Sequence, residues 1–305
     1  MVEVACHTVA QQRIRDALGD VNGRVRRHWY DIEDDLTIGS VRAMGEELLD
    51  HLGALSLEDP ALAGADARAA LWTAAECSLG VLQLGCFPRG DFTVPFPYIG
   101  ETLDSEDITF GATIDFAPTA ATWVEAFAMG VISGLLRDRD RMLGPLLADD
   151  YAPAIREHLP HSDRTSVSSP PDLAGMDALR RYLYIVETER SPWVAPGPVP
   201  LRKPDAGERA AAAAALDAAG AAWADGLSED QMLLRVLLED DREAFEEALA
   251  TRLARHRTGT PSTARPRTLL PVVPIALAAL AVQAHGWELG TTSGYLPAAL
   301  VGTAG

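Results

Sequence analysis

Apolar residues recur at spacings of three and four along most of the chain, which is the pattern of helices with one buried face. The pattern is clear in residues 14–25, 41–55, 173–186 and 233–257. Residues 66–84 are apolar on nearly every side, which predicts a helix at the centre of the fold. The sequence therefore predicts a mostly α protein, either a multi-helix bundle or an irregular solenoid-like array of about ten helices.

Two segments depart from this pattern. Residues 87–117 mix aromatic residues, prolines and glycines, so we expect an irregular loop with a short hairpin there. Residues 191–204 contain five prolines, which makes them extended, either as a linker or as a strap over the surface. These boundaries give an N-terminal helical region, 1–190, and a C-terminal helical region, 205–305. We expect the two regions to form one continuous globular unit.

The most apolar stretch, residues 267–290, could cross a membrane, line a pocket or fill the centre of a helical protein. Its uninterrupted run, 269–282, is shorter than the about 20 apolar residues of a membrane span. Pro271 and Pro274 also interrupt its start. We therefore predict a buried core helix from near Pro274 to about Leu289, and no membrane partner. The N-terminus lacks the basic and apolar segments of a signal peptide, which favours a cytoplasmic location.

The polar end of that helix holds His285 and Glu288, which lie three positions apart and so share a helical face. They allow two interpretations, a metal or acid–base pair, or a buried polar network with Trp287 as packing. A metal site needs further ligands than this pair supplies. We therefore predict a structural polar core of His285, Trp287 and Glu288, with no metal and no other cofactor. A small-molecule enzyme with a pocket near Glu76, His285 and Glu288 is an alternative.

The chain is acidic, with 26 Lys and Arg against 44 Asp and Glu and a net charge of −18. Residues 31–116 form an acidic block with seventeen acids and three arginines. Such a surface excludes nucleic acid as a partner, because phosphates bind Lys and Arg, and it favours a basic protein. We expect these acidic residues to contact the partner: Asp31, Glu33, Asp34, Asp35, Asp104, Glu106 and Asp107.

The sequence contains none of the common catalytic or nucleotide-binding signatures. There is no Gly-x-Gly-x-x-Gly, phosphate-loop, Gly-x-Ser-x-Gly or His-Glu-x-x-His motif. The three cysteines cannot all pair with one another, and they fit a reducing cytosol in which they are small buried apolar residues. We therefore predict a protein without enzymatic activity.

Several segments together resemble the immunity-49 family of bacterial immunity proteins, and they span most of the chain in order. The resemblance implies a helical protein that neutralises a cognate toxin of the same bacterium, as in polymorphic toxin systems, and it brings no catalytic residues. A helical adaptor that binds an unrelated partner is the second hypothesis, and the sequence leaves a homo-oligomer open. The segments are TAAECSLGVLQLGCFP (73–88), DDYAPAIRE (149–157), LLRVLLEDDREAFEEALATRLARHR (233–257), PRTLLPVVPIALAALAVQAHGWELG (266–290) and SGYLP (293–297).

Overall fold

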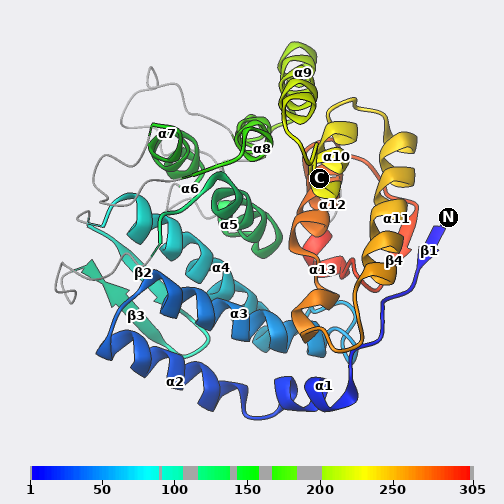
Figure 1. The fold of residues 1–305 in the computed structure, drawn as a ribbon. Helices are drawn as coiled ribbons and strands as arrows, with labels where there is room; N and C mark the ends of the chain where they lie inside the picture. The colour runs from blue at the N-terminus through cyan, green and yellow to red at the C-terminus, as the bar shows by residue number, and fades with distance from the viewer. Residues whose placement is uncertain are drawn as a thin grey trace.

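A computed structural model describes most of the chain, and Figure 1 shows its fold. Within the described residues the protein consists mainly of helices joined by short connections, with a few short strands, so the predicted mostly α fold is confirmed. The described ranges are 2–88, 91–105, 116–137, 143–157, 167–183 and 201–302.

The N-terminal part of the chain forms long helices around one hairpin. Its elements up to the hairpin are β1 (Val2–Val4), α1 (Gln11–Leu18), α2 (Val21–Asp34), α3 (Ile38–Leu55), α4 (Ala65–Cys86), β2 (Thr93–Phe96) and β3 (Glu101–Asp104). The elements that follow are α5 (Ala120–Ser133), the 3₁₀ turn η2 (Leu135–Arg137), α6 (Leu143–Pro145), the π-helix η3 (Leu146–Tyr151), α7 (Ala152–Arg156) and α8 (Pro170–Arg180).

The C-terminal part is helical as well. Its elements are α9 (Ala206–Ala222), α10 (Glu229–Leu237), α11 (Arg242–Gly259), the 3₁₀ turn η4 (Pro266–Leu269), α12 (Val272–Gln283), β4 (Thr291–Ser293) and α13 (Ala298–Val301). A capping box begins α10, where Ser228 and Gln231 exchange side-chain to backbone hydrogen bonds.

Helix α4 lies at the centre of the N-terminal part, as its apolar composition predicts. It packs against α3 on one side, α5 on another and strand β2 on a third (Figure 1). Small residues allow the close approach of α3 and α4, since a Cβ added at Gly45 would lie 3.0 Å from the Cβ of Cys77. Burial raises the pKa of the Cys77 thiol, and burial also raises that of Cys86 to about 12, so both behave as buried apolar side chains.

The predicted core helix is α12. It packs against α5, α10 and α11, and every residue from Pro274 to Val282 is buried. The segment Pro266–Gln283 is long and apolar enough to cross a membrane, with a mean hydropathy of 1.4, but 72% of it is buried inside the protein. Here it fills the centre of a helical fold, which is the environment the sequence predicts for it. One buried apolar cluster extends from Val4 to Leu300.

The predicted end of this helix is wrong. Helix α12 ends at Gln283 rather than near Leu289, because Gly286 adopts a φ of +74° that does not continue a helix. Backbone hydrogen bonds from His285 to Leu280 and from Trp287 to Ala281 close its last turn. Consequently His285 and Glu288 do not share a helical face: the His285 side chain is buried, and Glu288 is exposed.

The predicted hairpin is present. Strands β2 and β3 pair antiparallel, with Thr93 opposite Asp104 and Phe96 opposite Glu101. Its turn lies against α2, where the Arg26 guanidinium donates to the carbonyl of Ile99 at 3.0 Å and approaches Glu101 at 3.4 Å. The hairpin is therefore held between α2 and α4 (Figure 1).

The two ends of the described chain are joined. Strand β1 pairs parallel with β4, and the Ser293 hydroxyl donates to the Val4 carbonyl at 2.6 Å. Next to this pair, the Nδ1 of His7 lies 2.7 Å from the Tyr295 hydroxyl. The Pro-rich segment lies mostly outside the described residues; of the predicted 191–204, only 201–204 belong to them.

Candidate functional site

The C-terminal end of α2 presents four carboxylates to solvent. Asp31, Glu33, Asp34 and Asp35 are all exposed, as the sequence predicts. Within the described ranges, none of the four forms an ion pair, in contrast to many other acids of this chain. Tyr30 stands beside them with 58% of its surface exposed. We call these five residues the α2 acidic face.

The buried side of α2 explains why this face points outward. Val21, Val25, Trp29 and Ile32 are buried at spacings of three and four, and the Trp29 ring lies edge-on to Phe96 of the hairpin, with centroids 5.6 Å apart. The intervening residues must therefore face solvent. Packing of the buried side therefore fixes the position of the acidic face, although its own side chains are exposed.

The acidic charge of α2 lies at the less favourable end of the helix. The C-terminus of a helix carries partial negative charge and favours cations. The last turn of α2 contains Asp31, Glu33 and Asp34 and no basic residue. Stability of the helix therefore does not account for these carboxylates.

The other predicted contact residues lie apart from this helix. Asp104 ends strand β3, is half-buried, and accepts a hydrogen bond from the Thr93 hydroxyl at 3.2 Å. Glu106 and Asp107 lie outside the described residues. The structure thus shows Asp31, Glu33, Asp34 and Asp35 as one cluster, and it assigns Asp104 to a different feature, a pocket.

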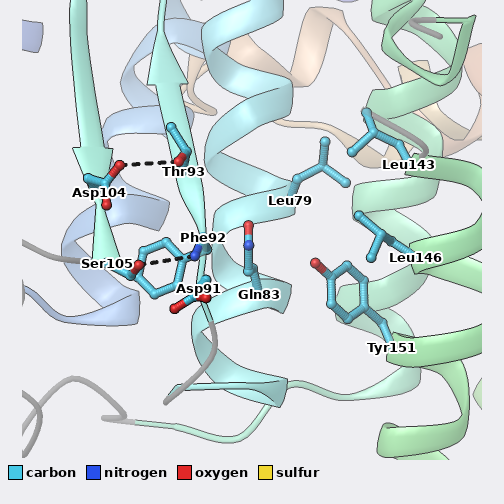
Figure 2. A pocket seen from close by; sticks show the side chains of 10 residues that line it. All are labelled: Leu79, Gln83, Asp91, Phe92, Thr93, Asp104, Ser105, Leu143, Leu146 and Tyr151. Carbon is cyan, nitrogen blue, oxygen red and sulfur yellow. Dashed lines mark hydrogen bonds between the residues drawn. The ribbon is translucent and has the colours of Figure 1, made fainter. Parts of the chain in front are cut away.

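The pocket has a volume of about 480 Å³ and opens between the hairpin, α4 and the η3 segment (Figure 2). We call it the hairpin pocket. Its volume falls within the range of small-ligand sites. Its walls combine carboxylate, amide and hydroxyl groups with apolar side chains. The lining residues are Leu79, Gln83, Asp91, Phe92, Thr93, Asp104, Ser105, Leu143, Leu146 and Tyr151.

Local backbone structure positions each wall of the hairpin pocket. Leu79 and Gln83 lie four residues apart on α4 and so share one face. On the hairpin side, the Ser105 amide donates to the Phe92 carbonyl at 3.0 Å and the Phe92 amide donates to the Ser105 hydroxyl at 3.2 Å. These two bonds close the hairpin beyond its last strand pair and hold the adjacent Asp91 at the rim.

The third wall of the hairpin pocket is a π-helix. A π turn has i→i+5 hydrogen bonds, and the Ala152 amide accordingly bonds to the Leu147 carbonyl. The wider turn brings Leu146 and Tyr151, five residues apart, to the same side, and Figure 2 shows both facing the pocket. Such turns are rare and occur often at functional sites. No pattern in the sequence predicted this one.

The predicted structural polar core exists, but its members differ from the prediction. The His285 side chain is fully buried; its Nδ1 lies 2.8 Å from an Asp240 carboxylate oxygen and its Nε2 lies 2.9 Å from the Tyr182 hydroxyl. Asp240 also binds Lys203 at 2.7 Å and Arg209 at 3.0 Å. Sequence reasoning missed Tyr182 and Asp240, because their distance from His285 along the chain leaves no local pattern.

The predictions for Trp287 and Glu288 have different outcomes. Trp287 packs on His285 and Phe245, with ring centroids 4.6 and 5.8 Å away, as a packing residue should. The inclusion of Glu288 in the polar core is wrong, because it is exposed. The reason is the early end of α12, after which the helical spacing between His285 and Glu288 no longer applies.

The environment of the polar core determines the protonation states of His285 and Asp240. Burial lowers the pKa of His285, although its hydrogen bond with Asp240 opposes this effect. For Asp240, burial raises the pKa, but hydrogen bonds from Lys203 and His285 outweigh it, so that the pKa is lowered overall. The geometry therefore favours a neutral imidazole beside an ionised carboxylate.

The alternative catalytic pocket near Glu76, His285 and Glu288 is not formed by these residues. Glu76 is buried on α4, His285 uses both ring nitrogens in the polar core, and Glu288 faces solvent. None of the three lines the hairpin pocket. In the part of the chain that the structure describes, no group of three or more His, Cys, Asp and Glu side chains could hold a metal ion.

Comparison with known proteins gives the family. No curated protein and no solved structure matches the chain. The family model described as immunity protein 49 matches residues 59–300, which include α4, the hairpin, the polar core and α12. This match covers well over half of the chain and agrees with the resemblance seen in the sequence segments. The chain belongs to the immunity protein 49 family.

Proposed function

We propose that this protein binds a cognate bacterial toxin and neutralises it by covering the surface with which the toxin acts. Membership of the immunity protein 49 family is the observation that carries the proposal. The toxin would be made by the same bacterium, and the protein would meet it in the cytoplasm. The protection is stoichiometric, since each protein molecule blocks the toxin molecule that it binds.

The α2 acidic face is the surface we propose for the first contact with the toxin. Four exposed carboxylates, which form no ion pair with another residue in the described ranges, and an exposed tyrosine lie together there. Carboxylates accelerate the approach of a basic partner over long range. Tyrosine is enriched at the centres of protein interfaces, because its ring buries a large area and its hydroxyl still forms a hydrogen bond. A basic toxin fits both features.

Binding without catalysis is consistent with the one arrangement that resembles catalytic machinery. Asp240, His285 and Tyr182 form an acid–imidazole–hydroxyl chain such as nucleophilic enzymes use. However, the Tyr182 side chain is 0% exposed, and so is that of His285. No substrate reaches these atoms in this conformation, so the arrangement supports a structural role.

Co-expression tests the function. The toxin encoded beside this gene should stop growth of a host cell, and the full-length protein should restore it. Purified toxin and protein should form a complex, and the toxin should lose its activity in proportion to the protein added. A toxin that stays fully active with excess protein would refute the proposal.

Charge reversal tests the surface. A triple variant should associate with the toxin about tenfold or more slowly at low salt, and the effect should be smaller at high salt. Its substitutions are Asp31→Lys, Asp34→Lys and Asp35→Lys. Asp225→Lys, Glu243→Lys and Glu247→Lys form the matched control, because they change the net charge equally at exposed positions on or near other helices. Equal association rates for the two triple variants would rule out the α2 acidic face.

A further inference from the structure

We propose that the hairpin pocket binds an arginine side chain of the partner protein. This inference rests on the proposed function, and it names the chemical group by which the toxin would be held. The charge, the shape and the backbone of the pocket each support it.

The polar groups of the pocket match a guanidinium. Asp91 and Asp104 place two carboxylates at the hairpin wall, the second of which also accepts from the Thr93 hydroxyl, and Gln83 and Tyr151 carry an amide and a hydroxyl on the other two walls (Figure 2). Among the described lining residues there is no Lys or Arg. A guanidinium has five N–H donors in one plane and no acceptor, so it suits a site with acceptors on several sides.

The apolar groups of the pocket match the stem of the same side chain. Leu79, Leu143 and Phe92 are buried residues of its walls, and Leu146 adjoins them. An arginine places its three methylene groups against apolar surface while its charged end reaches polar partners. A lysine would supply only a compact, strongly hydrated charge, which cannot bond acceptors on several sides in one plane.

The backbone holds these groups in place before a ligand arrives. The Ser105–Phe92 hydrogen bonds close the hairpin wall, and the π turn fixes the relative position of Leu146 and Tyr151. Preformed sites bind more tightly because less order must be imposed on binding. The same hairpin contacts α2 through Trp29, and α2 and the hairpin lie at one end of the molecule (Figure 1). Both surfaces therefore adjoin the same hairpin.

Titration of the full-length protein with N-acetyl-arginine methylamide tests the pocket without a toxin. We expect saturable NMR shifts of the Leu79, Leu143 and Leu146 methyl groups. The neutral citrulline analogue should bind at least about tenfold more weakly, since hydrogen bonds between charged groups contribute more than neutral ones. Absence of saturable shifts, or equal binding of both probes, would overturn the proposal. Tighter binding of spermidine than of the arginine probe would also overturn it, because the pocket would then suit a free polyamine.

Variants at one position give opposite predictions. Gln83→Lys brings a positive charge into the pocket and should weaken binding of the arginine probe by about tenfold or more, whereas Gln83→Glu should strengthen it. Asp91→Asn with Asp104→Asn should weaken it as well, and Asp225→Asn, an exposed aspartate elsewhere, is the control. Thermal melting confirms that each variant is folded. Unchanged binding in folded Gln83→Lys would contradict the proposal.

The toxin separates this inference from the proposed function. If the native protein neutralises the toxin and Gln83→Lys does so with the same affinity, the function stands and the pocket proposal fails. If the arginine probe binds but the native protein gives no protection, the proposed function fails, and the assignment of the arginine to a toxin fails with it. If Gln83→Lys weakens both the arginine probe and the toxin, both proposals are supported.

Discussion

Asp240 accepts a hydrogen bond of 2.8 Å from the Nδ1–H of His285, forty-five residues further along the chain. This pairing selects the tautomer in which the Nε2 of His285 accepts from the Tyr182 hydroxyl. The three side chains join the turn just after α8, the α10–α11 turn and the segment just after α12. One imidazole thus fixes the relative position of three segments that are distant in sequence.

His285→Ala should lower the free energy of unfolding by about 2–3 kcal/mol, because it leaves the Tyr182 hydroxyl and one bond of Asp240 without a partner in a buried site. Urea denaturation measures the change. Glu288→Ala is the control and should stay within about 0.5 kcal/mol, since Glu288 is exposed. A loss in His285→Ala no larger than in the control would contradict the structural role.

The polar core shows what the sequence predicts and what it does not. Apolar character predicted α12 as a core helix, and composition predicted the hairpin, because both depend on neighbouring residues. The partners of His285 were missed because they come from segments distant in sequence, just after α8 and between α10 and α11, and only the tertiary fold brings them together. The prediction that Glu288 belongs to the polar core was wrong, because the positive φ of Gly286 ends the helix before Glu288.

The candidate sites divide in the same way. The acidic run at the end of α2 was predicted directly, since a run of charges in a helix is exposed whatever the fold. The hairpin pocket was not predicted as a site, although Asp104 was singled out by its charge. Its walls come from α4, the hairpin and the η3 segment, and a π turn has no simple sequence signature.

Unfolding should become easier below about pH 6.5. Burial lowers the pKa of His7, His51 and His285 below their ordinary value of 6.5, so these histidines bind protons more weakly in the folded state than in the unfolded state. Their contribution to stability is complete above pH 6.5. It is lost as the pH falls from 6.5 towards the folded-state values, because the unfolded state then takes up more protons.

Urea denaturation at pH 7.5 and at pH 5.5 measures this dependence. The urea concentration at the midpoint of unfolding should be lower at pH 5.5 than at pH 7.5. In a His51→Gln variant that folds, the difference between the two midpoints should be smaller. A midpoint that stays constant or rises on acidification would contradict the prediction. Glu208 also contributes to the pH dependence, because its pKa is lowered from 4.5 to about 2 in the folded state. The stability that it contributes is lost only below pH 4.5, so this loss is separate from that of the histidines.

Gly53 is required where α3 crosses η4. A Cβ at this position would collide with the backbone of Pro266 and Arg267, and the backbone cannot move aside as a flexible side chain would. Gly53→Ala should therefore destabilise the protein by about 1–3 kcal/mol. Gly259→Ala at the end of α11 is the matched control, because a Cβ added at this position meets no other group within 4 Å. This variant should be neutral or slightly stabilising.

The α2 acidic face should show a conflict between stability and function. Replacing Asp34 by Lys removes a negative charge from the negative end of the helix and adds a favourable positive one. Asp34→Lys should therefore raise the free energy of unfolding by about 0.3–1 kcal/mol while it slows association with the toxin. Natural sequences keep such unfavourable residues where binding requires them.

Two measurements on the same variant decide this point. Urea denaturation gives the stability, and stopped-flow mixing with the toxin at low salt gives the association rate. Asp34→Asn is the intermediate variant and should show about half of each effect. If Asp34→Lys were more stable and associated as fast as the native protein, the carboxylate would have no part in toxin binding. A variant that loses stability would instead mean that Asp34 supports α2 in a way the helix dipole does not explain.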